Sequence, residues 1–313
     1  MELVREFGKI GKKDVSLAGG KGASLGEMTQ TGIPIPPGFV VLSHAFERFL
    51  EETDLNVEIA AALDSVDHQE MHTIDVASEI IQALINQAKM PKDISEVIFK
   101  SFIKLKVKYV AVRSSATAED SAKAAWAGQL DTYLNVTKFQ VVKNVQRCWA
   151  SLFTPRAIFY RFEKKLHRKS ISVAVVVQKM VQSEISGTAF SVHPVTLDRN
   201  QLIIEAGFGL GEAVVSGQIT PDSYVVDKRG FKILDKNVVE QERTLVRDKT
   251  SGNIWKDLSK VKGARQTLSD KQIIELSKML VKIEKHYRFP VDIEWAIEKN
   301  KLYVTQSRPI TTL

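Results

Sequence analysis

The chain of 313 residues contains a single cysteine, Cys148, and six histidines that show no metal-ligand spacing. One thiol excludes a disulfide framework and a thiolate metal cluster, and it fits a reducing compartment. No apolar run approaches the roughly 18 residues of a membrane-spanning helix, and the N-terminus lacks the apolar core of a signal peptide. These absences predict a cytoplasmic protein without a membrane partner.

The composition has too little glycine and proline for a fibrous or low-complexity protein, and its charge has a moderate positive balance. The 44 basic and 37 acidic residues give a net charge of +7, which indicates an anionic partner without identifying it. No aromatic stripe accompanies the basic stretch Arg161–Lys169, so we expect a solvated helix face there and no nucleic-acid partner.

The chain length suggests two domains or two lobes of one domain, at about 150 residues each. Strands and helices mix without a regular strand-helix-strand alternation, which predicts an α+β fold. We expect the lobes to comprise residues 1–180 and 181–313. Helical periodicity predicts helices within His44–Leu105, at Phe139–Leu152 and at Asp270–Tyr287. Ser269 and Gln272 have the spacing of a capping box at the start of the last helix.

Three glycines surround Lys21 in the segment Gly19–Gly22, which leads into a helical stretch. Glycines let backbone N–H groups approach an anion closely, and the helix directs its positive end to the same place. Lys21 would add a mobile charge suited to phosphate. The spacing is not that of a P-loop, and a glycine turn with a surface lysine is the alternative.

Arg113 ends an apolar strand and is followed by small and hydroxylated residues up to Asp120. Arginine offers a planar fork for phosphate oxygens at such a strand end. A turn with helix-capping hydroxyls is an equally good interpretation. Downstream, Gly128 provides another point of close approach and Thr132 a hydroxyl ligand. The later segment Gly207–Glu212 fails the dinucleotide fingerprint because its third glycine comes one residue too early.

The C-terminal segment predicts a hairpin with a polar face. Asp292 and Glu294 alternate with apolar residues on one strand, and Gln306 and Arg308 share a face of the next. A three-residue turn at Lys299–Lys301 would set Glu294 opposite Gln306 and Asp292 opposite Arg308. Oxygen ligands of this kind suit Mg²⁺, and the guanidinium suits a transferring phosphoryl group. A solvent-facing salt bridge is the alternative.

These motifs, in this order, resemble the ATP-binding domain of the phosphoenolpyruvate synthase and pyruvate phosphate dikinase family. Rifampin phosphotransferases carry a similar domain. The resemblance extends from about Leu17 to Leu313. The matching segments are Gly19–Met28, Pro36–Phe39, Val112–Asp120, Val177–Val181, Ser186–Gly187, Gly209–Val214, Asp292–Trp295 and Gln306–Thr311.

The resemblance implies an ATP-grasp fold with ATP held between two lobes. It also implies that Lys21 and Arg113 bind phosphates, that Gly128 and Thr132 serve the phosphate loop, and that Gln178 lies beside adenine. Glu294 and Gln306 would hold Mg²⁺, with Asp292 and Arg308 completing the catalytic set. The family reaction passes the β-phosphoryl group of ATP to a histidine on a separate domain and yields AMP and phosphate.

Several departures from the family pattern leave alternatives open. A phosphohistidine segment and a pyruvate-binding barrel are not found, so we expect the histidine to come from another chain or a missing region. His193 stands where relatives have aspartate, and Lys123–Trp126 replaces an acidic approach to the phosphate loop. A nucleotide-binding regulatory module without turnover, or the ATP domain of a rifampin-phosphotransferase-like enzyme, are the other hypotheses.

Overall fold

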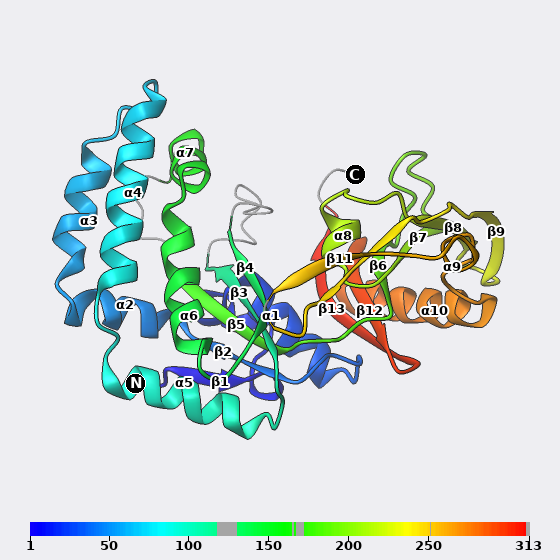
Figure 1. Ribbon diagram of the computed structural model, residues 1–313, viewed down its shortest axis with the longest axis horizontal. Coiled ribbons are helices and arrows are strands. Elements are labelled where there is room, and N and C mark those ends of the chain that lie inside the picture. The colour runs from blue at the N-terminus through cyan, green and yellow to red at the C-terminus, as the bar shows by residue number, and fades with distance from the viewer. Residues whose placement is uncertain (118–129, 165, 167–171, 251, 311–313) are drawn as a thin grey trace. The chain divides into compact units, whose positions relative to one another are not determined.

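A computed structural model describes residues 1–117, 130–164, 166, 172–250 and 252–310 (Figure 1). Unit 1 comprises Met1–Glu27 and Pro37–Met180, and unit 2 comprises Met28–Pro36 and Val181–Leu313. The division inferred from sequence assigns residues 28–36 to the N-terminal lobe. In the structure they pack with unit 2, where the Val304 amide donates to the Pro34 carbonyl at 3.0 Å.

Unit 1 is built on a five-stranded antiparallel sheet in the order β1-β2-β5-β3-β4. Its valine-rich central strand is buried at every residue except the last, as expected for a strand covered on both faces. The strands are β1 (Val4–Glu6), β2 (Gly38–Val41), β3 (Val110–Ala116), β4 (Thr132–Val136) and β5 (Val173–Lys179).

One face of this sheet carries a helical layer that contains most of the core of unit 1. Trp149 is fully buried there, with its ring 5.6 Å from that of Phe46 and 5.1 Å from that of Phe49. The helices of unit 1 are α1 (Val15–Gln30, whose last residues belong to unit 2), α2 (Ser43–Glu52), α3 (Leu55–Asp64), α4 (Met71–Gln87), α5 (Lys92–Lys104), α6 (Val141–Ala150) and α7 (Pro155–Glu163). Short 3₁₀ turns lie at Phe7–Lys9, Lys12–Asp14 and Ser151–Phe153.

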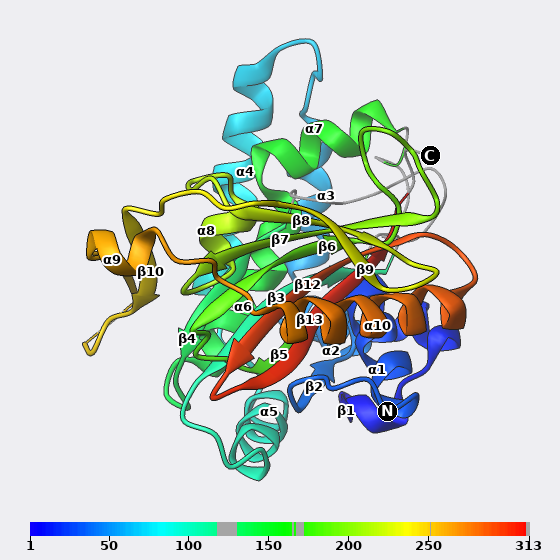
Figure 2. The ribbon, with the colours of Figure 1, turned by 90° about the vertical axis from the view of Figure 1, so that its right-hand side faces the viewer.

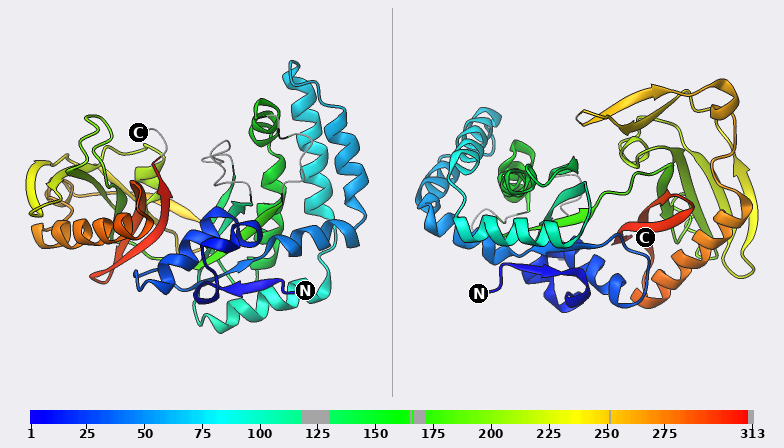
Figure 3. Two further views of the ribbon diagram at one scale, coloured as in Figure 1. Left: turned by 180° about the vertical axis from the view of Figure 1, so that it is seen from behind. Right: turned by 60° about the horizontal axis from the view of Figure 1, so that its bottom comes forward.

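Unit 2 contains a six-stranded antiparallel sheet in the order β13-β12-β6-β7-β8-β9 and a separate two-stranded sheet, β10-β11. Helix α10 runs along the large sheet, and the β10–β11 hairpin forms a second small sheet that contacts β7 and α8 through β10 (Figures 2 and 3). The elements are β6 (Ile185–Phe190), β7 (Gln201–Phe208), α8 (Glu212–Val215), β8 (Asp222–Asp227), β9 (Lys232–Asn237), β10 (Arg243–Arg247), β11 (Asn253–Asp257), α9 (Lys260–Gly263), α10 (Asp270–Tyr287), β12 (Val291–Glu298) and β13 (Lys301–Pro309).

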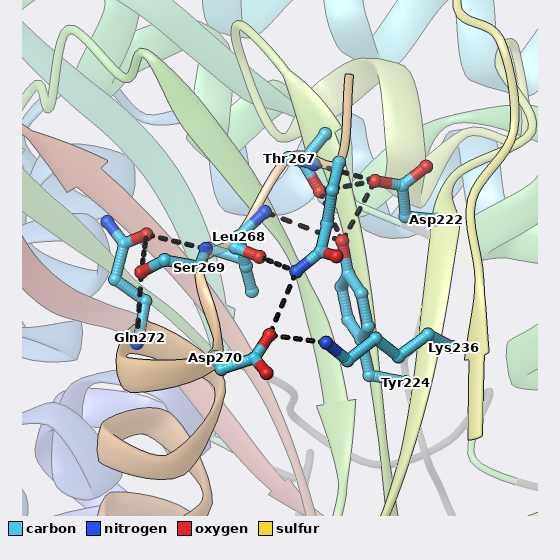
Figure 4. A network of polar contacts seen from close by, with 9 residues as sticks. Asp222, Tyr224, Lys236, Thr267, Leu268, Ser269, Asp270 and Gln272 are labelled. Atoms are coloured by element: carbon cyan, nitrogen blue, oxygen red, sulfur yellow. Dashed lines mark hydrogen bonds and ion pairs between the residues drawn. The ribbon is translucent and has the colours of Figure 1, made fainter. Parts of the chain in front are cut away.

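A buried carboxylate joins the large sheet to the segment that enters α10 (Figure 4). Asp222 is fully buried, and one of its oxygens accepts from the amide and hydroxyl of Thr267 and from the Tyr224 hydroxyl, each at 2.8 Å. Burial raises the pKa of Tyr224 to about 12, so this hydroxyl stays a donor. The carboxylate is thereby satisfied without a cationic partner, as a buried polar group requires.

The sequence correctly predicted the α+β class, and the bounds of α10 and its capping box are confirmed. Ser269 Oγ accepts from the Gln272 amide, and the Gln272 side chain accepts from the Ser269 amide at 2.9 Å. Strand β4 and the β10–β11 hairpin were missed, and only the last residues of α7, from Arg161, were expected to be helical. The start of helix α7 could have been predicted, because Thr154 caps the helix and Pro155 occupies its first turn.

The expectation that Arg161 is solvated was wrong. Arg161, in the stretch expected to be solvated, is only 5% exposed, and burial lowers its pKa to about 10. Its guanidinium lies over the Phe153 ring, 5.6 Å from the centroid. A second cation–aromatic pair lies on β11, where the half-buried Trp255 has the Arg243 guanidinium 4.2 Å from its ring centroid. Both pairs gain from a cation over an aromatic face.

Candidate functional site

The glycine turn around Lys21 is fixed to the end of strand β3. Helix α1 breaks at Gly19, which has φ 67° and ψ 172°, and a Cβ there would lie 2.2 Å from Ser115 Oγ. The Ser115 hydroxyl accepts from the Gly22 amide at 3.2 Å and donates to the Ala18 carbonyl at 2.9 Å. This strained conformation is open to glycine only, so the glycine permits the close approach. Lys21 is therefore held on a turn that contacts the strand of Arg113.

Arg113, Thr132 and Gln178 share one face of the unit 1 sheet. Arg113 is paired with Thr132 of β4 and with Val176 of β5, and Gln178 lies two residues beyond Val176 on the same strand. Directly opposed residues share a face, and so do residues two apart on a strand. The alternate valines of β3 and β5 lie on the other face, in the core. The glycine turn covers the Arg113 face, because it packs against Ser115.

Gln178 presents a buried donor that the described residues leave without a partner. Its side chain is 2% exposed, and its amide nitrogen has no hydrogen-bond partner among the residues that the structure describes. A buried amide of this kind costs about 1–3 kcal/mol unless a partner is supplied. The residue thus fits a role in which a ligand acceptor, such as a purine nitrogen, completes its hydrogen bonds.

Lys21 and Cys148 are close enough to interact electrostatically. Burial raises the pKa of the Cys148 thiol to about 12, and the positive charges of Arg147 and Lys21 oppose the shift. The thiol is fully buried and its pKa is far above neutrality, so it is not a nucleophile.

In unit 2, the hairpin of β12 and β13 brings the four predicted side chains together in the predicted pairs. Glu294 lies opposite Gln306, and Asp292 lies opposite Arg308. The Gln306 amide nitrogen donates to Glu294 Oε1 at 3.0 Å. Arg308 donates to both carboxylate oxygens of Asp292, at 3.2 and 3.0 Å. The polar patch expected from alternation is confirmed at the level of these pairs.

The register that produces these pairs differs from the expected one. The turn has two residues, Lys299 and Asn300, both at positive φ, and Glu298 pairs with Lys301 rather than with the residue after it. A β-bulge then shifts the ladder by one residue, and Thr305 is the additional residue on β13. The two departures cancel, which is why the expected pairs are found.

The surroundings of the patch make Asp292 easier to protonate than an aspartate in water. Burial raises the pKa of Asp292, and the charge of Glu294 adds to this rise, whereas the Arg308 guanidinium opposes both. The side chains of Asp292 and Arg308 are 22% and 39% exposed. The two-point contact fixes the guanidinium plane, which is the geometry that recognises phosphate oxygens.

The patch lies on the face of the unit 2 sheet away from α10. The Tyr224 hydroxyl forms hydrogen bonds with Thr267 and Leu268, which directly precede α10, so Tyr224 lies on the sheet face that this helix covers. Glu294 lies on the opposite face, in a row that continues through Thr188 of β6 to Glu205 of β7. The Thr188 hydroxyl donates to Glu205 at 2.8 Å. Sequence reasoning missed this extension, although alternation along β7 places Glu205 among apolar neighbours.

The structure describes one of the two other glycine-containing sites that the sequence singled out. In Gly207–Glu212, a Cβ at Gly209 would lie 2.2 Å from Thr244 Oγ1, so this glycine permits close packing against β10. The Glu212 carboxylate accepts from the Asn253 side chain at 2.9 Å. Gly128, predicted to serve the phosphate loop, lies outside the described residues.

Comparison with known proteins identifies the family of the chain. Residues 15–313 match the family model described as "Pyruvate phosphate dikinase, AMP/ATP-binding domain". The chain belongs to this family. The ATP-grasp type of α+β fold expected from the sequence is the fold of this domain, and the family description names it as an ATP-binding domain.

The most similar curated relatives include phosphoenolpyruvate synthases of archaea. The chain is 44% identical to a probable phosphoenolpyruvate synthase of Methanocaldococcus jannaschii over 100% of its own length and 27% of the relative's. The corresponding protein of Archaeoglobus fulgidus is 46% identical over 97% of the chain and 41% of the relative. A rifampicin phosphotransferase of Bacillus subtilis is 36% identical over 99% and 36%.

The chain thus spans 27% to 41% of the length of these relatives. Both kinds of relative are phosphotransferases, so the chain belongs to a phosphotransferase family. Across the part of the chain that the structure describes, no helix has both the length and the apolar character needed to cross a membrane.

Proposed function

We propose that the chain is the ATP- and Mg²⁺-binding part of a phosphotransferase of the phosphoenolpyruvate synthase type, acting in the cytoplasm. Its reaction passes the β-phosphoryl group of ATP to a histidine of a separate domain and the γ-phosphoryl group to water, with AMP and phosphate as the released products. The histidine domain is supplied in trans or by a region outside this chain. The chain supplies both lobes of the ATP-grasp fold, and residues 28–36, which pack with unit 2, belong to the C-terminal lobe.

The observation that carries this proposal is the pairing of Glu294 with Gln306 and of Asp292 with Arg308, in a chain of an ATP-binding family. A carboxylate and an amide oxygen are donors that Mg²⁺ accepts, together with nucleotide phosphates. The two residues already contact one another, with the Gln306 amide nitrogen 3.0 Å from Glu294 Oε1. Mg²⁺ held there would neutralise charge on the phosphates.

The other charged groups bind and orient the phosphate chain. Lys21 and Arg113 supply positive charge from adjoining parts of unit 1, and Arg308 supplies it from unit 2. Arg308 is held in one orientation by Asp292, so little conformational entropy is lost when it meets a phosphoryl group. Preorganised charge of this kind, rather than a covalent step on the protein, is the main requirement of phosphoryl transfer.

The purine end of the nucleotide is assigned to Gln178. Its amide nitrogen is buried, no described residue accepts a hydrogen bond from it, and it lies on the same sheet face as Arg113. Thr132, opposite Arg113, is exposed and offers its hydroxyl to the phosphates. We also assign Gly128 to the phosphate loop, on the resemblance alone.

ATP binding tests the assignment of the two cations in unit 1. Calorimetric titration should show weaker binding in Lys21→Ala and in Arg113→Ala, by roughly 10- to 150-fold, which corresponds to about 1.5–3 kcal/mol for each lost charge-assisted bond. Lys13→Ala, at an exposed position of the preceding turn, is the matched control and should bind like the wild type. Unchanged affinity in both site variants would remove these residues from the site.

Phosphoryl transfer is tested with an added histidine domain from a relative. The chain, ATP and this domain should together produce AMP and an acid-labile phosphohistidine, detected by chromatography and mass spectrometry. ATP binding without either product would favour the regulatory module. The 36% identity to a rifampicin phosphotransferase supports a second candidate function. A chain with that function would transfer phosphate to the antibiotic when the histidine domain and an antibiotic-binding domain are added.

A further inference from the structure

Both edge strands of the unit 2 sheet contain a β-bulge. On β13 the pairs Trp295–Val304 and Glu294–Gln306 leave Thr305 as the additional residue. On β9, at the other edge, the additional residue is Leu234, between the partners of Val226 and Val225. A bulge on an edge strand hinders pairing of that edge with the sheet of another molecule, and this is a sufficient reason for the bulge at Leu234. The bulge at Thr305 differs because the polar patch lies directly beside it.

The extra residue is not needed to bring the pairs together. With a two-residue turn at Lys299 and Asn300, a regular ladder continued past Trp295–Val304 would place the next residue of β13 opposite Glu294. In a chain without Thr305, that residue is Gln306, and Arg308 then falls opposite Asp292. The same pairs would form on the same face without any bulge. Register alone therefore does not account for Thr305.

The bulge changes the direction in which the side chains after it point. A bulge bends its strand, increases the local twist and re-aims the side chains that follow it. Gln306, 4% exposed, is the first residue after the extra one. The strand is held on both sides of this point, by the Val304 amide bond to the Pro34 carbonyl at 3.0 Å and by the contact of Arg308 with Asp292. The bend is thus concentrated at Thr305 and Gln306.

The facing strand is anchored at the same level. Trp295 is 1% exposed, and its indole nitrogen donates to the Thr188 carbonyl at 3.1 Å. Glu294, next to it, pairs with Thr188 in the ladder. Glu294 therefore stands on a fixed strand while the bulge sets the approach of Gln306 to it.

We infer that Thr305 is a positioning residue, whose bulge aims the Gln306 amide at the cation shared with Glu294. The inference rests on the proposed function, since it requires that these two residues hold Mg²⁺. Thr305 acts through its backbone, as the extra residue of the ladder.

Deletion of Thr305 tests this inference, with deletion of Leu234 as the matched control. Each deletion removes one edge bulge from the same sheet, and only the first lies beside the patch. The readout is the dissociation constant for ATP by calorimetry, in Mg²⁺ and in EDTA. We expect the deletion of Thr305 to weaken binding in Mg²⁺ by about tenfold or more, the loss of one good ligand contact, and to leave binding in EDTA unchanged. The deletion of Leu234 should change neither.

Equal affinities for the two deletion variants in Mg²⁺ would overturn the inference, as would a loss of equal size in Mg²⁺ and in EDTA. To protect folding, the deletion of Thr305 is also made with Lys299→Asn and Asn300→Gly, which favour the positive φ values of the turn. If it still fails to fold while the deletion of Leu234 folds, the bulge is a folding element and the inference is wrong. Gln306→Ala tests the assignment beneath it: if this variant keeps the Mg²⁺ effect, the proposed metal ligands are wrong, whatever the deletions do.

Discussion

Replacing Gly19 with alanine puts a methyl group where the structure has Ser115. The new Cβ would lie 2.2 Å from the Ser115 hydroxyl oxygen and 2.3 Å from its carbonyl oxygen, so backbone has to move. The conformation at φ 67° and ψ 172° costs a non-glycine residue about 1–3 kcal/mol. Overpacking adds about 1–3 kcal/mol. We therefore expect Gly19→Ala to destabilise unit 1 by about 2–6 kcal/mol in all.

Two other glycines separate the terms of this sum. Gly32 has φ 71° but no atom within 4 Å of an added Cβ, so Gly32→Ala should cost only the backbone term, about 1–2 kcal/mol. Gly8 has neither a positive φ nor a close neighbour, and Gly8→Ala should be near neutral. Urea unfolding, followed by probes in each unit because the units need not unfold together, gives the three values.

The same substitution affects ATP binding, because the turn that carries Lys21 must move away from the end of β3. Calorimetry should show affinity reduced by about tenfold or more in Gly19→Ala, and unchanged in Gly8→Ala. A loss of stability for Gly19→Ala within 1 kcal/mol of that for Gly32→Ala, with ATP affinity intact, would refute the contact between the glycine turn and Ser115.

Three further predictions concern buried polar groups. Tyr224→Phe removes one donor from the buried Asp222 carboxylate and should cost about 1–3 kcal/mol in urea unfolding; a loss below about 0.5 kcal/mol would contradict the network. Burial raises the folded pKa of Asp292 above its unfolded value, so its stabilising contribution is present at acidic pH and is lost as the pH rises through the folded pKa. Asp292→Asn should lack this loss and gain on the wild type as the pH rises through the folded pKa of Asp292, and a parallel pH profile for the two proteins would refute the shift. Cys148 should resist iodoacetamide in the folded chain and react in urea, and rapid labelling of the native protein by mass spectrometry would contradict its burial.

Local patterns in the sequence accounted for the secondary structure of long periodic segments and for the paired side chains of the hairpin. Alternation along each strand places Asp292 with Glu294 and Gln306 with Arg308, whatever the turn does nearby. The turn and the bulge could not be predicted in the same way. The short turn and the bulge each shift the pairing of the strands by one residue, in opposite directions. The alternation of the strands outside the bulge is therefore the same whether both features are present or both are absent.

Long-range contacts were the other part that the sequence could not supply. The Gly19 conformation depends on Ser115, almost a hundred positions further along the chain, and no local pattern links the two. The burial of Arg161 likewise depends on the Phe153 ring and the surrounding helices rather than on the basic stretch that contains it. Motif order predicted the family, whereas these contacts required the fold.

Titration of ATP into the complete chain, with Mg²⁺ and then with EDTA, tests the central claim most directly. We predict one binding site per chain, with affinity in Mg²⁺ at least several-fold higher than in EDTA, because Glu294 and Gln306 would lose their cation in the chelator. Absence of binding in both conditions, or equal affinity in the two, would contradict the assignment of this chain as an ATP- and Mg²⁺-binding phosphotransferase domain.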